Sequence, residues 1–142
     1  MSLWHDFHVK TFTSKSQRTG EIGETIVCRH LIRQGFAIIE RNFTRKWGEI
    51  DIVAQKGIIF HFIEVKAVTR ENDQLQSGYG RWNEWRPEDQ VHGLKQRRLI
   101  RIIETYMAGG EVDEWQFDVA CVYIDFEGKK ARIRLLPNII LV

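Results

Sequence analysis

Asp51, Glu64 and Lys66 are the residues whose types and spacing could do chemistry together. They lie within two stretches that are otherwise mostly apolar, residues 49–53 and 60–66, which both resemble strands. An isolated charge buried in such a strand is costly unless it is paired or bound to a metal. Two carboxylates on neighbouring strands offer the oxygen ligands that Mg²⁺ prefers, and the lysine would lie beside the metal's water. The structural alternative is an ion pair between Lys66 and one of the two carboxylates.

Glu24 adds a third carboxylate from a predicted helix over residues 17–34, which Gly35 would end. The apolar residues that recur there at three- and four-residue steps are Ile22, Ile26, Val27, Leu31 and Ile32. Glu24 precedes Val27 by three residues, Cys28 by four and Leu31 by seven, so it lies on the stripe that we expect to be buried. A charged glutamate on the buried stripe of a helix requires a structural or functional explanation.

The elements that must position these residues follow a simple order. We expect strands over residues 36–39, 49–54 and 58–66, a helix from Pro87 to Gly109, and strands over 115–124 and 129–136. Residues 125–128 form a turn between the last two strands, and residues 139–142 form a last apolar piece. On the strand over 115–124, one side carries Trp115, Phe117, Val119, Cys121 and Tyr123, with Trp115 expected in the core.

This order predicts one α/β domain over residues 1–142, with a mixed central sheet flanked by helices. Residues 1–16 would form an N-terminal arm, and residues 68–86 a long loop. Within residues 49–53, alternation puts Ile50 and Ile52 on one face and the two acids with Val53 on the other.

The expected hairpin between residues 49–54 and 58–66 poses a geometric problem. A turn centred near Lys56 places Asp51 opposite His61, three residues from Glu64. At about 3.3 Å per residue that offset is roughly 10 Å. A longer turn, a bulge or a splayed strand end is therefore needed to bring Asp51 and Glu64 together.

Composition narrows the class of protein. The 142 residues carry a formal net charge of +2, with 43% apolar and 28% charged residues, which excludes a disordered or fibrous chain. No apolar run approaches the roughly 20 residues of a membrane span, and the polar residues 1–10 predict no signal peptide. Cys28 and Cys121 lack a CxxC partner, which excludes a zinc finger and favours a reduced, cytoplasmic protein.

Basic residues gather in three clusters that hold 11 of the 21 lysines and arginines. They are Arg41, Arg45 and Lys46; Lys95, Arg97, Arg98 and Arg101; and Lys129, Lys130, Arg132 and Arg134. They would form a phosphate-binding surface if the fold brings them together, and solvated faces otherwise. Trp82 and Trp85, and similarly Trp47, could stack on unpaired bases, or cap the core or a dimer interface.

Five motifs in order resemble a known family. They are Gly20-x-x-Gly23-Glu24, Arg41-Asn42-Phe43, Gly48-Glu49-Ile50-Asp51, Glu64-Val65-Lys66 and Phe117-Asp118-Val119. From Gly20 to Tyr123 the chain resembles the YraN family of predicted bacterial endonucleases. That family is similar to archaeal Holliday junction resolvases and belongs to the PD-(D/E)xK nuclease superfamily. The resemblance implies a restriction-endonuclease-like αβββαβ core.

The resemblance also implies roles for particular residues. Asp51, Glu64 and the main-chain carbonyl of Val65 would ligate Mg²⁺ or Mn²⁺, and Lys66 would orient or activate the attacking water. Glu24 would support the site or hold a second metal.

Three further features bear on the resemblance. Gln96 falls where related nucleases place another polar active-site residue, and Asp118 is interpreted as structural. Val68 stands where the family often has an arginine, the nearest being Arg70, and residues 74–85 are longer and richer in tryptophan than expected.

The predicted function is a metal-dependent endonuclease that hydrolyses DNA, including branched or single-stranded substrates, in repair or recombination. Predicted nucleic-acid contacts are Arg41, Arg45, Lys46, Arg70, Trp82, Trp85, Lys95, Arg97 and Arg98. The alternatives are a non-catalytic nucleic-acid-binding or assembly module that keeps the fold, and a nuclease acting on RNA. A homodimer is expected by analogy with resolvases, which cut paired strands.

Overall fold

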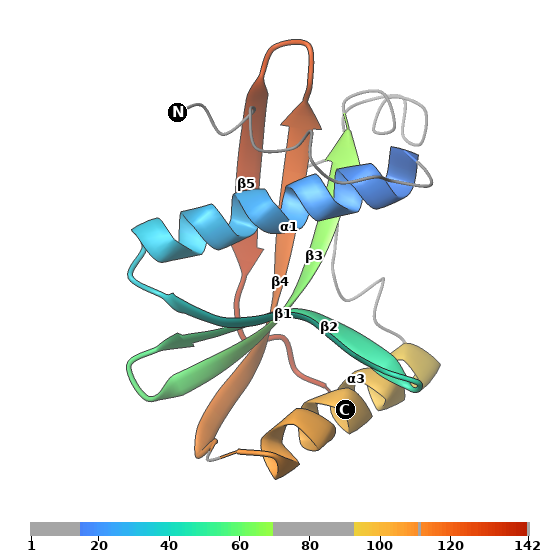
Figure 1. Cartoon of the computed structure of the whole chain (residues 1–142), viewed down its shortest axis with the longest axis vertical. Helices are drawn as coiled ribbons and strands as arrows, with labels where there is room; N and C mark the ends of the chain where they lie inside the picture. The colour runs from blue at the N-terminus through green and yellow to red at the C-terminus, as the bar shows by residue number, and fades with distance from the viewer. Residues whose placement is uncertain (1–14, 70–92, 111, 142) are drawn as a thin grey trace.

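The computed structural model describes residues 15–69, 93–110 and 112–141. Its elements are α1 (Lys15–Arg33), β1 (Ala37–Arg45), β2 (Gly48–Lys56), β3 (Ile59–Thr69), α3 (Gly93–Ala108), β4 (Glu114–Asp125) and β5 (Lys130–Leu136). The strands form one sheet in the order β1-β2-β3-β4-β5, in which β3 and β4 are parallel and the other neighbours antiparallel. In Figure 1, α1 crosses the sheet over β3, β4 and β5, and α3 lies at the other end, beside the β1–β2 hairpin. This confirms the predicted α/β fold with a mixed sheet flanked by helices and the restriction-endonuclease-like order.

The α1 side of the sheet holds one apolar core. Apolar residues of α1 pack there against β2, β3 and β4: the core contains Ile22, Ile26, Val27, Cys28, Leu31, Ile52, Ala54, Ile63, Ala120, Val122 and Ile124. Ile32 was expected in this stripe, but it is 57% exposed, because it is one residue beyond Leu31 and points about 100° away around the helix. Gly35 ends α1 as predicted, with a φ of +93°, and Phe36 N donates to the Leu31 carbonyl at 3.0 Å.

The α3 side holds a second core. Leu99, Ile102 and Ile103 of α3 pack against buried residues of β1, β2, β3 and β4. Phe117, Val119 and Cys121 are buried on this side as predicted. Trp115 was expected in the core, but it lies near the start of β4 and is 40% exposed, and it meets the Phe62 ring edge-on, with centroids 5.8 Å apart.

Two strands are longer than predicted. β1 continues beyond residue 39 to Arg45, because its pairing with β2 resumes after a bulge between Ile38 and Glu40 and extends as far as Arg45 and Gly48. β3 continues through Thr69, because it stays paired with β4, so the loop predicted over 68–86 does not begin at residue 68. The rest of that loop, with Arg70, Trp82 and Trp85, and the predicted arm before Lys15 lie outside the described residues.

At a kink in β2, at Asp51, the side chains of the strand change the core into which they point. Ile52 packs in the α1-side core, whereas Ile50 packs in the α3-side core together with Val53. The expectation that Ile50 and Ile52 share a face was therefore wrong. Asn42 lies opposite the kink on β1, between the pairs Arg41–Ile52 and Phe43–Ile50, and has a φ of +54°. A positive φ at a non-glycine residue bends the hairpin locally.

The β2–β3 hairpin also differs from the expected register. Its turn lies at residues 57–58, where Gly57 has a φ of +61°, so Asp51 falls in line with Glu64 and not with His61. The expected offset was wrong because the turn is centred beyond Lys56. The expected splayed strand end is nevertheless present, because pairing of the two strands ends at Ile52–Ile63. Asp51 thus lies where β2 leaves β3.

The two described helices share one further property. Neither α1 nor α3 combines the length and the apolar character needed to cross a lipid bilayer.

Candidate metal centre

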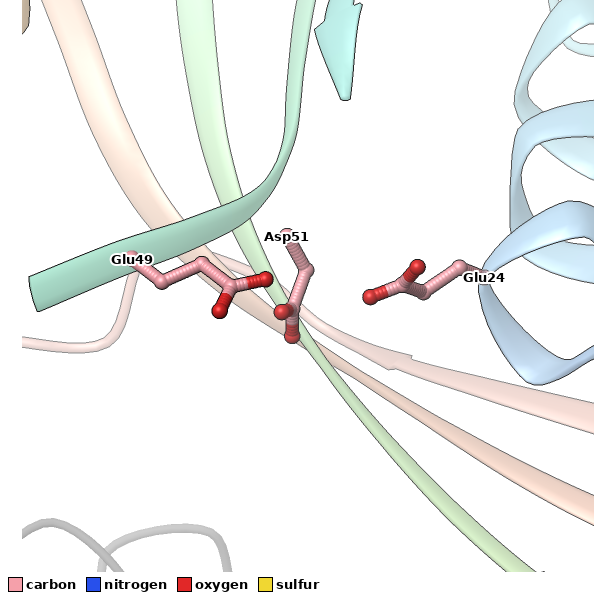
Figure 2. Close-up of side chains that lie close together, drawn as sticks. All are labelled: Glu24, Glu49 and Asp51. Atoms are coloured by element: carbon pink, nitrogen blue, oxygen red, sulfur yellow. The ribbon is translucent and has the colours of Figure 1, made fainter. Parts of the chain in front are cut away.

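Three carboxylates converge at the kink in β2. Glu24 of α1 and Glu49 and Asp51 of β2 each place an oxygen within 4.8 Å of the others. In Figure 2, Glu24 points from the helix toward Asp51, and Glu49 approaches from along the strand. Glu24 is only 9% exposed, Asp51 is half-buried and Glu49 is exposed. We call these three side chains the acidic cluster.

Gly23 explains why α1 comes close enough to deliver Glu24. A Cβ atom at Gly23 would lie 2.7 Å from the Cβ of Ala67 on β3, a distance that no real pair of side chains sustains. Only a glycine therefore lets the helix backbone approach the sheet here. The next residue, Glu24, is held against the kink.

Asn42 bridges two of the carboxylates. In the amide orientation that satisfies its neighbours, its side-chain nitrogen donates to Glu24 at 3.2 and 3.3 Å and to Glu49 at 2.9 Å. Because Asn42 lies opposite Asp51 in the bent hairpin, the backbone bend aims its amide at the acidic cluster. The asparagine partly offsets the repulsion without carrying a charge.

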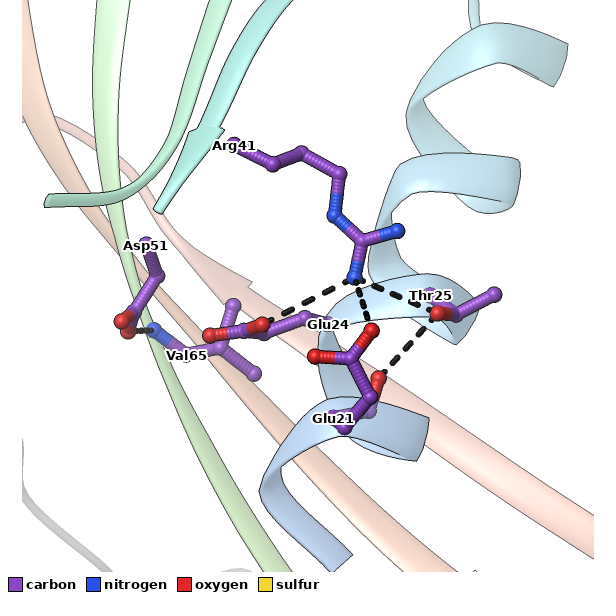
Figure 3. A network of polar contacts seen from close by, with 6 residues as sticks. All are labelled: Glu21, Glu24, Thr25, Arg41, Asp51 and Val65. Carbon is purple, nitrogen blue, oxygen red and sulfur yellow. Dashed lines mark hydrogen bonds and ion pairs between the residues drawn. The ribbon is translucent and has the colours of Figure 1, made fainter. Parts of the chain in front are cut away.

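Arg41 supplies the positive charge on the α1 side. Its Nη2 lies 3.6 Å from Glu24 Oε2, 3.4 Å from Glu21 Oε1 and 3.2 Å from Thr25 Oγ1, as Figure 3 shows. Arg41 was predicted to contact nucleic acid. That contact stays a prediction, and the structure places the Arg41 guanidinium against the acidic residues of α1, beside the acidic cluster.

The acidic cluster is electrostatically unfavourable when all its members are ionised. Burial raises the pKa of Glu24 to about 8, with further increases from the charges of Asp51 and Glu21, while Arg41 opposes the shift. Burial likewise raises the pKa of Asp51 to about 6. The Val65 N–H opposes that shift, and the charges of Glu64 and Glu49 add to it. A divalent cation would relieve this repulsion more fully than one shared guanidinium.

The middle of β3 completes the site. Asp51 Oδ2 accepts a hydrogen bond from Val65 N at 2.8 Å, where a β2 carbonyl would bond in a continuing ladder. The N–H and C=O of one residue in a strand point to the same side, so the Val65 carbonyl also faces β2. Lys66 Nζ lies 3.6 Å from Glu64 Oε1. The ion pair considered as the structural alternative is therefore present, and it lies beside Asp51.

The donor set suits a hard cation. Glu24, Glu49 and Asp51 supply carboxylate oxygens from α1 and β2, and β3 supplies Glu64 and the Val65 carbonyl. Oxygen donors of this kind are those that Mg²⁺ takes in proteins. The residues present therefore fit Mg²⁺ or Mn²⁺. Glu64 lies outside the group of three carboxylates whose oxygens are within 4.8 Å of one another.

The structure brings together Glu24, Asp51, Glu64, Val65 and Lys66, all named from the sequence. Gln96 lies half-buried in the first turn of α3, and its role at the site stays a prediction.

Sequence reasoning missed Glu49 and Asn42 as site residues. The two-residue spacing of Glu49 and Asp51 along a strand was a usable signal for Glu49. Nothing in the sequence predicts the bend that directs the Asn42 amide toward the acidic cluster.

A basic groove lies beside the acidic cluster. It encloses about 740 Å³ and is lined by Thr44, Arg45, Lys46, Trp47, Gly48, Glu49, Arg97, Arg98 and Arg101. Two of the three basic clusters of the sequence thus converge, one from the β1–β2 turn and one from α3. Lys130, Arg132 and Arg134 lie on β5, at the opposite edge of the sheet. Lys95 belongs to α3 by its backbone.

Proteins of one family are similar to this chain in sequence. Residues 23–122 match the model of the uncharacterised protein family UPF0102. A UPF0102 protein of Alkaliphilus metalliredigens is 39% identical over 125 residues, covering 87% of this chain and 97% of its own. A UPF0102 protein of Campylobacter lari is 39% identical over 118 residues, covering 82% and 88%, and one of Campylobacter jejuni is 34% identical over 112 residues, covering 78% and 88%. The chain belongs to UPF0102, the YraN family.

Proposed function

We propose that the protein is a metal-dependent endonuclease that hydrolyses phosphodiester bonds in DNA. The observation that carries this proposal is the meeting of Glu24, Asp51 and the Glu64-Val65-Lys66 segment at the kink in β2. Three secondary-structure elements, α1, β2 and β3, bring several carboxylates and one lysine together, and burial raises the pKa of Glu24 and of Asp51. Such an arrangement is typical of a site selected for chemistry.

The site residues divide into those that hold charge and those that handle water. Asp51, Glu64, the Val65 carbonyl and Glu24, joined by Glu49, would hold Mg²⁺ or Mn²⁺. When bound, the cation lowers the pKa of water and offsets the negative charge of the phosphate. Lys66, held near Glu64, would orient the attacking water and stabilise the charge that develops on the phosphate oxygens. Asn42 and Arg41 keep the carboxylates in place in the absence of substrate.

The setting of this activity is part of the proposal. Cys28 and Cys121 are free and buried, which is compatible with the reducing cytoplasm. We place the enzyme there, in DNA repair or recombination. Paired cuts in branched DNA would require two such centres, which a homodimer would supply.

A cleavage assay tests the proposal. Duplex, single-stranded, flapped and four-way-junction DNA, together with RNA, are incubated with Mg²⁺ or Mn²⁺ and the purified wild type, Glu64→Gln, Lys66→Ala or Glu127→Ala. Glu127 lies exposed in the β4–β5 turn and serves as the matched acidic control. We expect cleavage to fall by more than about 100-fold in the two site variants, as when a transition-state contact is lost, and to persist in the control.

Other outcomes assign other functions. Cleavage that survives in both site variants contradicts the proposed site. Binding without cleavage by the wild type favours the non-catalytic nucleic-acid-binding or assembly module. Cleavage of RNA alone favours the ribonuclease.

A further inference from the structure

The basic groove is built from two segments that are about 50 residues apart in the sequence. The β1–β2 turn contributes Arg45 and Lys46, and one exposed face of α3 contributes Arg97, Arg98 and Arg101. Over the described part of the chain, five cations and one carboxylate, Glu49, line it. That charge far exceeds what one acidic neighbour can balance, so the groove favours a ligand with several negative charges.

Close packing fixes the two segments relative to each other. A Cβ atom at Gly48 would lie 3.3 Å from Ile102 Cβ and 3.4 Å from the Arg98 carbonyl, so the hairpin backbone rests directly on α3. The Trp47 indole N–H donates to Thr105 Oγ1 at 3.1 Å. The width of the groove is therefore set by the fold before any ligand arrives.

Two of the arginines are already ordered by aromatic rings. The Arg101 guanidinium carbon lies 4.6 Å from the centre of the Trp47 ring, and that of Arg45 lies 4.3 Å from the centre of the Phe43 ring. A guanidinium held on a ring face keeps N–H groups at its edge for a second partner. Ordering these side chains in advance lowers the entropy lost on binding.

Glu49 connects the groove to the acidic cluster. It lines the groove and is also one of the three carboxylates that converge at the kink. A chain of phosphates lying in the groove would therefore lead directly to that cluster. A single phosphate would engage only some of the five cations, whereas a polymer of phosphates would engage both segments at once.

We infer that this groove holds the phosphate backbone of a nucleic-acid strand and leads it past Glu49 to the acidic cluster. This inference rests on the proposed function for what happens at the inner end of the groove. The binding surface itself consists of the β1–β2 turn and α3. Its contacts are to phosphate, so DNA and RNA strands share the chemistry.

Binding without metal tests the groove apart from catalysis. Anisotropy of fluorescent 30-nucleotide DNA and RNA, single-stranded and duplex, is measured in EDTA with the full chain. Arg97→Ala/Arg98→Ala is compared with Arg18→Ala/Arg33→Ala, which removes two exposed arginines from α1. We expect the groove variant to lose about tenfold or more in affinity at low salt. Its slope of log K against log salt should fall by about 1.4–1.8, because each phosphate contact contributes about 0.7–0.9.

The outcomes separate this inference from the proposed function. Equal affinity in the groove variant and the α1 control overturns the inference that the groove binds the strand, even if the wild type cleaves. Weakened binding in the groove variant alone supports the groove, even if the wild type cleaves nothing. Failure of the wild type to bind any of the four probes overturns it. Thermal melts of both variants verify that they are folded, and tighter binding of RNA or DNA identifies the strand.

Discussion

Asp118 and the acidic cluster, two places where acids leave the solvent wholly or in part, differ in the partners of their carboxylates. Asp118, 6% exposed, is fully partnered: Oδ2 lies 2.6 Å from His61 Nδ1, and Oδ1 accepts from Gln116 Nε2 and Asn138 N, both at 2.8 Å. Glu24 and Asp51 face each other and further carboxylates, and Arg41 lies 3.6 Å from Glu24.

The difference separates an acid with a structural role from acids that we propose to be functional. Each oxygen of Asp118 is matched by a donor, so its burial stabilises the fold. The acidic cluster instead holds charges whose mutual repulsion burial makes worse, and such strain is tolerated where a ligand relieves it. The interpretation of Asp118 as structural agrees with these contacts, although the residue lies in one of the five family motifs.

The largest expected effect falls on the partnered acid. Asp118→Ala removes the partner of buried His61 and of the Asn138 N–H, so we expect the free energy of unfolding to drop by about 3–5 kcal/mol. Urea denaturation measures this loss. A drop below about 1 kcal/mol would show that the two sets of acids do not differ in this way.

The next effect has the opposite sign and depends on pH. The folded-state pKa of Glu24, about 8, lies above its ordinary value of 4.5, so between these pH values the folded chain binds more protons than the unfolded one. The free energy of unfolding should therefore fall as pH rises from about 4.5 to 8, and Asp51 adds to the fall between about 4 and 6.

Glu24→Gln removes most of this dependence. We expect the variant to be more stable than the wild type at pH 8, by about 2–4 kcal/mol, and nearly equal to it at pH 4.5. Urea denaturation at a series of pH values gives both curves. Parallel curves for the two proteins would mean that Glu24 is not the proton-binding group.

The smallest expected effect concerns the cation. At pH 8, millimolar Mg²⁺ or Mn²⁺ should stabilise the wild type by about 1–2 kcal/mol, since a ligand that binds the native state shifts the unfolding equilibrium by mass action. The gain should shrink at pH 5.5, where protons compete for the carboxylates. Asp51→Asn should abolish it, and Asp118→Asn should not. Differential scanning fluorimetry measures all four cases, and equal shifts in both variants would argue against a site at Asp51.

The order of elements could be predicted from the sequence because its local signals agree with the fold. Helical periodicity and Gly35 identified α1, and alternating apolar residues identified β2, β3 and β4. The inward position of Glu24 followed from the same periodicity. Asp51, Glu64 and Lys66 stood out because charges are rare in buried strands.

The features that could not be predicted from the sequence depend on tertiary packing. The kink at Asp51 exists because β2 must bury Ile52 against α1 and Ile50 against α3, and alternation along an isolated strand assigns both to one side. The positive φ of Asn42 and its bridge to Glu49 depend on that kink. The turn at residues 57–58 moved the register by three residues, a shift that decides whether Asp51 meets Glu64.

The glycines that precede Glu24 and Glu49 bear on the size of the cation that the proposed site would take. Gly23 brings α1 against Ala67, and Gly48 brings β2 against α3, so backbone contact sets how far apart the two carboxylates are held. Mg²⁺ and Ca²⁺ differ in their oxygen distances by about 0.3–0.5 Å. A methyl group at Gly48 would force its neighbours to move by a comparable amount, given the 3.3 Å approach to Ile102. In the proposed cation site, selection between small and large ions would therefore depend on two residues that carry no side chain.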